Sequence, residues 1–283
     1  MKIAGVVILY NPDEDLQARI ESYLQILEAL YVFDNTELLN DDIKNKLSGI
    51  PKVKYSHDEE NKGISFRLNQ AAELALKEGF DLLLTMDQDS YFDKGVAEKY
   101  KTCFINYNEF SKTAMFGLEF IKDSPSAICS PEKVSELITS GSIVNLNLYN
   151  KIGDFDENLF IDYVDHEYCY RAQTKGYELI KFSNIFLQHA IGSTQQKRSI
   201  ASFKNTQRSF HSSTRIYYMV RNYLYVNAKY KNSFPQELKN QRNSILTRIK
   251  NKLLYNTNRI KLLKLIFRAY KDYKSGRMGK INK

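Results

Sequence analysis

The sequence has 283 residues, a hydrophobic content of 43% and a formal net charge of +8. This length fits one large α/β domain or two smaller ones, and the composition is ordinary for a folded soluble protein. No apolar run is long enough to span a bilayer, and the short run after Met1 ends at Asn11-Pro12, so we expect neither a transmembrane helix nor a secretory signal.

The charge is distributed unevenly along the chain. Residues 229–283 contain 16 Lys and Arg against 2 Asp and Glu, whereas residues 1–228 contain 25 against 31. A mildly acidic body followed by a strongly basic tail indicates that the tail meets an acidic surface, either a membrane or a nucleic acid.

The first part of the chain alternates strand and helix patterns. Residues 3–10 form a continuous β-branched apolar run before Asn-Pro, which is typical of a buried parallel strand. The elements predicted after it are a helix over 16–29, strands over 30–35 and 52–56, a helix over 64–78 closed by Gly79, and a strand over 80–86.

The three cysteines, Cys103, Cys129 and Cys169, are odd in number and lack a CxxC spacing. This pattern predicts neither a disulfide framework nor a zinc knuckle, and it agrees with a reducing compartment.

The second part of the chain has a looser pattern. The elements predicted there are a strand over 113–120, a strand, a Gly-Ser turn and a helix within 136–153, a helix over 164–175 closed by Gly176, and a strand within 177–193. Alternating strands and helices indicate an open, mostly parallel sheet, in which ligands bind beyond the carboxyl ends of the strands.

Polar residues follow three of the predicted strands, at Tyr10-Asn11, Asp34-Asn35 and Asp87–Asp89. These clusters should converge on one edge of the sheet. Paired carboxylates at a strand end can hold a hard cation such as Mg²⁺ or Mn²⁺, whose charge would remove their mutual repulsion. The alternative is a solvated turn that happens to be acidic.

A second acidic cluster lies in "FIDYVDHEYCYR", residues 160–171. Asp165 would lie in the first turn of a helix, where the helix dipole favours an anion, and an ionised carboxylate there can act as a general base. The alternative is simple capping of that helix by Asp162 or Asp165.

Seven short motifs follow one another along residues 3 to about 193: "VVILYN", "VFDN", "ENKGISFRLNQA", "LLLTMDQDS", "SGS", "FIDYVDHEYCYR" and "QHAIGS". In this order, they resemble the motifs of inverting glycosyltransferases of family 2. Within the family, the sequence is most similar to bacterial rhamnosyltransferases. The resemblance implies a GT-A fold, an open mixed and mostly parallel sheet flanked by helices, over residues 1–210. A basic, amphipathic helical extension would follow over 211–283.

The resemblance also implies roles for individual residues. The donor nucleotide would contact Tyr10, Asn11, Asp34, Asn35, Asn61, Gly63, Asn69 and Asp87. A Mn²⁺ or Mg²⁺ ion would be held by Asp87, Asp89 and His189, and the acceptor or sugar would lie near Gly141, Ser142, Asp162 and Arg171. Asp165 takes the place of the catalytic base. Val164 stands where the family commonly has a second acidic residue, so the choice between Asp165 and Asp162 stays open.

The implied reaction moves a sugar, such as L-rhamnose, from dTDP-rhamnose or a UDP-hexose, with inversion. The acceptor would be a hydroxyl of a saccharide or lipid-linked saccharide in bacterial cell-surface polysaccharide synthesis. Two other readings are a phosphatase of the haloacid dehalogenase type, whose nucleophile motif is also an apolar strand followed by DxD, and a non-catalytic nucleotide-sugar-binding module.

The basic tail contains an apolar helical stripe through Leu263, Ile266, Phe267 and Tyr270. Apolar and basic faces on one helix predict contact with the anionic inner face of the cell membrane, and therefore a cytoplasmic, peripheral protein. Nucleic acid is disfavoured because no recognised binding motif accompanies the charge. The alternative is packing on the body or on a second copy in a homodimer.

Overall fold

The structure is a computed structural model that describes residues 1–120, 129–189, 194–198, 205–209, 212–255 and 258–282. The chain forms two compact units. Unit 1 comprises residues 1–157 and 164–189, and unit 2 comprises residues 158–163 and 190–283. The boundary predicted at residue 210 falls inside unit 2, and the division into a catalytic domain and an extension stays a prediction.

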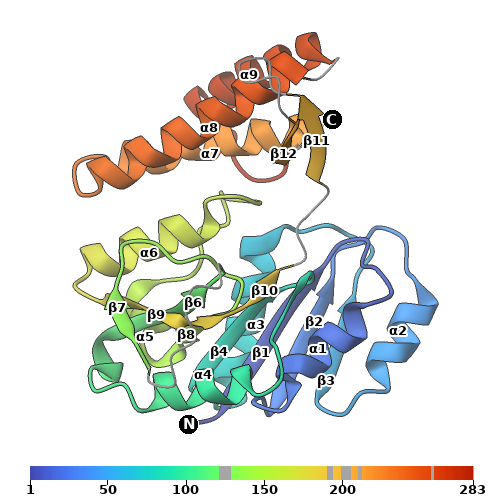
Figure 1. Ribbon diagram of the computed structural model, residues 1–283, viewed down its shortest axis with the longest axis vertical. Coiled ribbons are helices and arrows are strands. Elements are labelled where there is room, and N and C mark those ends of the chain that lie inside the picture. The colour runs from blue at the N-terminus through green and yellow to red at the C-terminus, as the bar shows by residue number, and fades with distance from the viewer. Residues whose placement is uncertain (121–128, 190–193, 199–204, 210–211, 256–257, 283) are drawn as a thin grey trace. The chain divides into compact units, whose positions relative to one another are not determined.

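Unit 1 is built on an eight-stranded mixed sheet with strand order β3-β2-β1-β4-β8-β6-β9-β7 (Figure 1). Its strands are β1 (Ile3–Leu9), β2 (Ala29–Asp34), β3 (Val53–His57), β4 (Leu82–Asp87), β6 (Thr113–Glu119), β7 (Pro131–Lys133), β8 (Ser142–Asn145) and β9 (Glu178–Phe186). A separate antiparallel pair joins β5 (Ser90–Tyr91) to β10 (Gln188–His189).

Strands β1 to β4 are mutually parallel, as the alternating pattern predicted. The apolar runs of β1 and β4 are almost entirely buried because helices and neighbouring strands cover both faces of the sheet. The carboxyl ends of β1, β2 and β4 therefore lie side by side at one edge, and this edge carries the three polar clusters.

One strand near Gly141 lies at a different place along the chain than predicted. Strand β8 follows the Gly-Ser turn instead of preceding it, and it runs antiparallel to β4 and β6. All four residues of β8 are buried, yet Ser142 and Asn145 are polar, so the apolar pattern did not reveal it. The helix predicted next is α5 (Leu146–Ile152), which ends before Gly153 as expected.

The α-helices that the structure describes in unit 1 are α1 (Leu16–Leu24), α2 (Asp41–Ser48), α3 (Ile64–Lys77), α4 (Val96–Ile105), α5 and α6 (Val164–Thr174). Helix α3 packs against β1 and β4, and both α4 and α6 pack against β9. Helix α2 was not predicted because it buries only Leu47. Its start is fixed by a cap, in which the Asn40 side chain accepts hydrogen bonds from the backbone N–H groups of Asp42 and Ile43.

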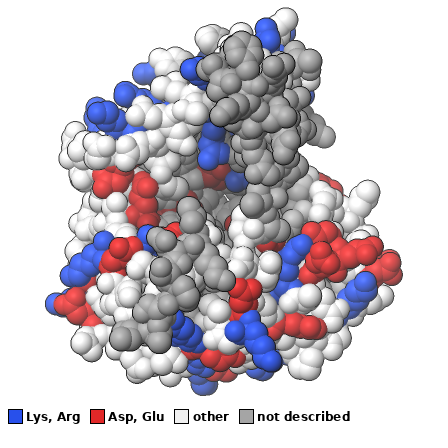
Figure 2. All heavy atoms as spheres, viewed as in Figure 1, with Lys and Arg blue, Asp and Glu red and all other residues white. Residues whose placement is uncertain are grey.

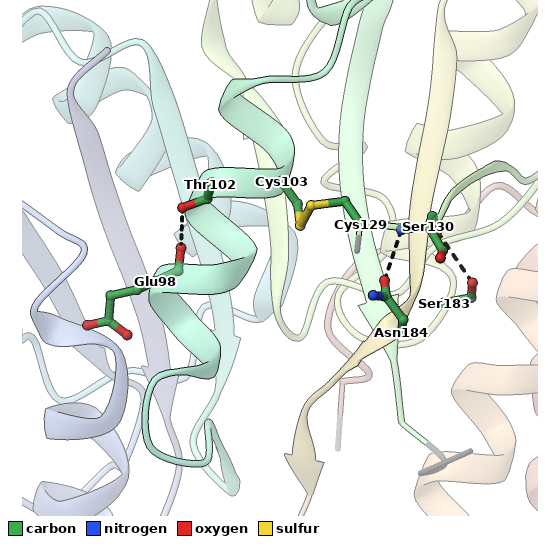
Figure 3. The surroundings of a disulfide bond; sticks show 7 residues. All are labelled: Glu98, Thr102, Cys103, Cys129, Ser130, Ser183 and Asn184. Carbon is green, nitrogen blue, oxygen red and sulfur yellow. Dashed lines mark hydrogen bonds between the residues drawn. A yellow bond between two sulfur atoms is a disulfide. The ribbon is translucent and has the colours of Figure 1, made fainter. Parts of the chain in front are cut away.

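The expectation of no disulfide was wrong. Cys103 in α4 is bonded to Cys129, just before β7, with Cα atoms 5.6 Å apart (Figure 3). Beside this bond the Ser130 N–H donates to Asn184 Oδ1 at 3.0 Å, so the segment is also tied to β9. A separation of 26 residues gave no sequence signal, because only the fold brings α4 next to this strand. The argument for a reducing compartment from unpaired cysteines is thereby removed.

Unit 2 contains α7 (Ser213–Tyr230), α8 (Pro235–Tyr255), α9 (Arg259–Lys274) and the hairpin β11 (Thr194–Arg198) and β12 (Asn205–Ser209). Its hydrophobic core contains the buried side chains of Phe160, Tyr217, Tyr218 and Ala269. Lys and Arg side chains gather on the visible face of the C-terminal helices (Figure 2). Among the described residues, no helix has both the length and the apolar character needed to cross a bilayer.

Candidate active site

The acidic pair lies where the sequence predicted it. Asp87 is the last residue of β4, and its side chain is exposed although the rest of the strand is buried. The β5–β10 pair places His189 opposite Ser90, next to the pair. Asp87, Asp89 and His189 each offer a ligand atom, and these atoms lie within 4.8 Å of one another. Two carboxylates and an imidazole form a donor set that suits a divalent cation such as Mn²⁺.

Two buried serines support this cluster and were not predicted. Ser90 Oγ lies 2.8 Å from Nδ1 of His189, and Ser140 Oγ donates to Ser90 Oγ at 2.8 Å. Ser140 also accepts a hydrogen bond from the backbone N–H of Asp87 at 3.3 Å. Groups that hold the second nitrogen of a ligating histidine fix the orientation of its ring. Ser90 directly follows Asp89 and Ser140 directly precedes Gly141 in the sequence. This adjacency to predicted site residues was the only sequence feature by which the two serines could have been proposed.

Gln88, between the two aspartates, ties β4 to β1. Its side chain accepts from the backbone N–H of Tyr10 at 2.8 Å and donates to the carbonyl of Tyr10 at 3.1 Å. The Asn11 N–H donates to Thr36 Oγ1 at 2.9 Å, which ties β1 to β2 in turn. The ends of these strands are therefore held together by side chains as well as by the sheet.

A pocket of about 520 Å³ lies beyond the ends of β1 and β2. It is lined by Asn11, Pro12, Thr36, Leu38, Leu39, Asn40, Asp41 and Asp42. Leu38 is 82% exposed at its rim, which leaves an apolar surface uncovered. Pockets of this size and mixed lining commonly hold small ligands.

Asp34 and Asn35 lie at this edge but are buried. Asp34 accepts hydrogen bonds at both carboxylate oxygens, from the backbone N–H of Thr36 at 2.9 Å and from the Tyr55 hydroxyl at 2.8 Å. Asn35 Oδ1 accepts from Arg67 Nε at 2.8 Å. Both residues therefore shape the turn after β2, and their predicted contact with the nucleotide stays a prediction.

Asn61 and Gly63 form the turn that starts α3. Asn61 Oδ1 accepts from the Gly63 N–H at 3.1 Å, and Gly63 has φ of 86°, which favours glycine. Arg67 in the first turns of the helix pairs with Asp58 and contacts Asn35. This buried arginine was missed, although it lies inside the motif "ENKGISFRLNQA".

Gly141 and Ser142 form a tight, buried turn. Gly141 has φ of 73°, and a Cβ there would lie 2.9 Å from Leu187 Cδ2. Its N–H donates to the carbonyl of Thr85 at 2.8 Å, and Ser142 Oγ donates to the carbonyl of Ile138. The Gly141 backbone and the Ser142 hydroxyl are thus used within the fold, and a role of these residues toward the acceptor stays a prediction.

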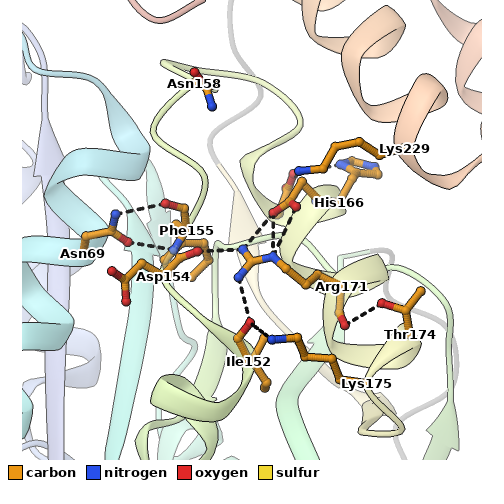
Figure 4. A network of polar contacts seen from close by, with 12 residues as sticks. Asn69, Ile152, Asp154, Phe155, Asn158, His166, Arg171, Thr174, Lys175 and Lys229 are labelled. Atoms are coloured by element: carbon orange, nitrogen blue, oxygen red, sulfur yellow. Dashed lines mark hydrogen bonds and ion pairs between the residues drawn. The ribbon is translucent and has the colours of Figure 1, made fainter.

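Asn69 and Arg171 both hold the loop after α5 (Figure 4). The Asn69 amide donates to the Phe155 carbonyl and to Glu157 and accepts from the Phe155 N–H. Arg171 donates to the carbonyls of Ile152 and Asp154. Their predicted roles toward nucleotide and acceptor stay predictions, but the fold gives both side chains structural partners.

Asp165 lies in the first turn of α6, as predicted, with its side chain 18% exposed. His166 Nδ1 is 2.7 Å from Asp165 Oδ1, and His166 Nε2 is 4.0 Å from Glu136. Burial raises the pKa of Asp165, but the contacts with His166 outweigh it and hold the pKa below its ordinary value. The carboxylate is therefore ionised at neutral pH, as a general base requires.

Asp162 has different surroundings. Its carboxylate accepts hydrogen bonds from Arg215 Nε and Nη2 at 3.0 to 3.2 Å, a charge-assisted pairing within unit 2.

The last motif, "QHAIGS", is described only in part. The structure describes Gln188 and His189, whereas residues 190–193 lie outside the described residues.

Solved structures identify the fold of this chain. S. aureus TarS in complex with UDP-GlcNAc has a TM-score of 0.56 at 14% identity, covering 96% of this chain and 80% of that chain. GalNAc-T7, solved with UDP, GalNAc and Mn²⁺, has a TM-score of 0.60 at 12% identity, covering 97% of this chain and 57% of that chain. The fold is that of the GT-A glycosyltransferases.

The sequence gives the family. The dTDP-rhamnosyl transferase RfbF of Shigella flexneri is 31% identical over 241 residues, and the match covers 78% of this chain and 78% of that protein. The chain therefore belongs to the family of nucleotide-sugar glycosyltransferases that includes this enzyme, as the seven motifs indicated. No protein-family model matches the sequence. Membership decides against the phosphatase and against a non-catalytic module.

Proposed function

We propose that this enzyme transfers L-rhamnose from dTDP-L-rhamnose, with inversion, to a hydroxyl of a saccharide or lipid-linked saccharide. The observation that carries the proposal is the cluster of Asp87, Asp89 and His189 at the carboxyl edge of the sheet, the edge that also carries the pocket beyond β1 and β2. The identity of the sugar is supported by the 31% identity to a dTDP-rhamnosyl transferase. Such transfers build cell-surface polysaccharides, the setting we propose for this enzyme.

Asp87, Asp89 and His189 would hold a divalent ion, Mn²⁺ or Mg²⁺. When bound, such an ion neutralises negative charge that develops on the departing diphosphate. Asp87 and Asp89 without a cation would repel each other, so the donor set fits the ion chemically. The strand ends held by Gln88 and Thr36 give the nucleotide a rigid edge to bind.

Asp165 is the proposed general base. Its carboxylate takes the proton of the acceptor hydroxyl while the acceptor oxygen forms a bond to the anomeric carbon. The bond from that carbon to the diphosphate oxygen breaks, and the nucleoside diphosphate leaves with the electron pair. A single displacement from the opposite face inverts the carbon. Asp162 is the less suitable base because the permanently charged Arg215 contacts both of its carboxylate oxygens, whereas His166 contacts Asp165 at Oδ1.

The test compares Asp165→Asn with Asp162→Asn in a transfer assay. We expect Asp165→Asn to reduce kcat by roughly 10²-fold or more, because a general base acts in the transition state. Stabilisation of the folded protein by donor nucleotide and Mn²⁺ should persist in this variant. A wild-type rate in Asp165→Asn beside a disabled Asp162→Asn would assign the base to Asp162.

The donor is tested by thermal stabilisation with dTDP-L-rhamnose and with UDP-hexoses, each with Mn²⁺. A bound ligand stabilises by RT ln(1 + [L]/Kd), so the true donor gives the largest rise in Tm. A larger shift with a UDP-hexose would overturn the assignment of dTDP-rhamnose and leave the proposed glycosyl transfer standing.

We further propose that unit 2 docks on the anionic cytoplasmic leaflet, where a lipid-linked acceptor would be anchored. Helix α9 exposes Ile260, Leu263, Phe267 and Tyr270 at helical spacing, with Phe267 65% exposed. Lys261, Lys264, Lys271 and Lys274 border this stripe on the same helix. Basic residues near an anionic surface contribute about 1 kcal/mol each. Self-association through this face, giving a homodimer, is the competing outcome.

A further inference from the structure

Segment 158–163 leads directly into the helix that carries Asp165, yet it packs as part of unit 2. Within it, Asp162 and Tyr163 have φ of 63° and 71°. They are the only adjacent non-glycine residues with positive φ in the part of the chain that the structure describes. L-residues rarely adopt this conformation, and it persists only where surrounding groups hold it.

Asn222 of α7 holds this pair. The side chain is completely buried, and its Nδ2 donates to the carbonyls of Ile161 at 2.8 Å and Asp162 at 3.0 Å. Its Oδ1 accepts from Arg221 Nε at 3.1 Å, which orients the amide so that its two N–H groups face the segment. Both N–H groups of Nδ2 therefore donate to backbone carbonyls of this turn.

The amide is itself anchored by a chain of hydrogen bonds across unit 2. Arg221 Nη1 donates to the Tyr217 hydroxyl at 3.2 Å, and that hydroxyl donates to Asp272 Oδ2 at 2.8 Å. Asp272 lies on α9, so two helices of unit 2 fix the position of Asn222. Linked, buried hydrogen bonds of this kind rigidify the groups that they join.

We propose that Asn222 is a positioning residue for glycosyl transfer. By binding the carbonyls of Ile161 and Asp162, it fixes the left-handed turn that directs the chain into α6 and thereby places the carboxylate of Asp165. The inference rests on the proposed role of Asp165 as the base. A misplacement of a reacting group by about 1 Å can reduce a rate by 10²-fold, so a residue outside the reacting groups can control kcat.

The test uses Asn222→Asp and Asn222→Ala in the full chain, with Asn227→Ala as the matched control. Asn227 lies on the same helix, and its Oδ1 accepts a hydrogen bond from the Tyr223 hydroxyl one turn earlier. We expect both Asn222 variants to lower kcat by at least about 10-fold, with KM for the donor and the nucleotide-dependent rise in Tm unchanged. The control should keep wild-type kcat.

A double variant separates positioning from general loss of structure. If Asn222 acts through Asp165, adding Asn222→Ala to Asp165→Asn should lower kcat no further, because the base is already absent. If the Asn222 variants do not fold, Arg215→Gln replaces them. This substitution removes the guanidinium group that binds the Asp162 carboxylate. The Arg215 side chain is 45% exposed, so we expect a smaller loss of kcat than in the Asn222 variants.

The outcomes distinguish the inference from the proposed function. Wild-type kcat in folded Asn222→Ala, or a full multiplicative loss in the double variant, overturns the positioning role while Asp165 remains the base. A wild-type rate in Asp165→Asn alone overturns the proposed base, and with it the inference that rests on it.

Discussion

Replacing Asn69 by alanine should destabilise the protein without changing its affinity for the donor. The Asn69 side chain is buried and makes four hydrogen bonds, to the Tyr149 hydroxyl, to the N–H and carbonyl of Phe155, and to Glu157. Removing it leaves three buried polar groups of Tyr149 and Phe155 without these partners, and each costs about 1–3 kcal/mol. The Glu157 contact is partly exposed and contributes little.

Taking the lower value for each of the three groups, the expected loss in the free energy of unfolding is at least about 3 kcal/mol. For a chain of this size that corresponds to a decrease in Tm of roughly 10 °C. Asn69→Asp keeps the accepting oxygen but loses both donated bonds, and it places a carboxylate against the Phe155 carbonyl, so it should also destabilise. Lys77→Ala, on an exposed position of the same helix, is the control and should leave Tm unchanged.

Urea unfolding gives the free energy, and titration with dTDP and Mn²⁺ at a temperature well below Tm gives the nucleotide affinity. The resemblance to the family placed Asn69 in the nucleotide site instead. An unchanged Tm together with a large loss of nucleotide affinity would refute the structural reasoning and favour that direct role.

Three further outcomes follow from the structure. Burial raises the pKa of Asp58, but Arg67 and Lys62 lower it more, to about 2. The stability that the ionised Asp58 contributes is therefore complete above about pH 4 and is lost as the pH falls toward 2. In urea unfolding, the loss of unfolding free energy on acidification should be smaller in Asp58→Asn than in the wild type. Reducing the Cys103–Cys129 bond, which spans 26 residues, should lower the free energy of unfolding by about 3.5 kcal/mol in the chain-entropy estimate, and a protein that lacks both cysteines should not respond to reductant. Phe267→Glu should weaken sedimentation with anionic vesicles, as should raising the salt to about 1 M; equal binding by variant and wild type would contradict membrane docking through α9.

Local patterns were sufficient for the parallel half of the sheet and for its polar edge. The apolar runs of β1 and β4, each ended by polar residues, predicted buried parallel strands and therefore a shared carboxyl edge. Asp87, Asp89 and Asp165 could be proposed from sequence because their roles depend on a strand end or a helix start, and both features are visible over a few residues.

The rest depended on contacts between distant parts of the chain. His189 reaches the acidic pair only because β10 pairs with β5, and Ser90 and Ser140 matter only once that pairing exists. The missed strand β8 is polar at both ends, and helix α2 is fixed by a cap instead of an apolar stripe, so neither has the periodicity by which elements are recognised.

The sequence by itself determined the alternation of strands and helices, the acidic strand end and the basic tail, because each is set by side chains near one another along the chain. Only the tertiary structure decided that Cys103 meets Cys129 and that Asn69 and Arg171 bind a loop. It also decided that Asn222 holds the turn before Asp165. Those pairings join residues 19 to 86 positions apart, and no local preference of the chain encodes which distant partners the packed fold will bring into hydrogen-bonding distance.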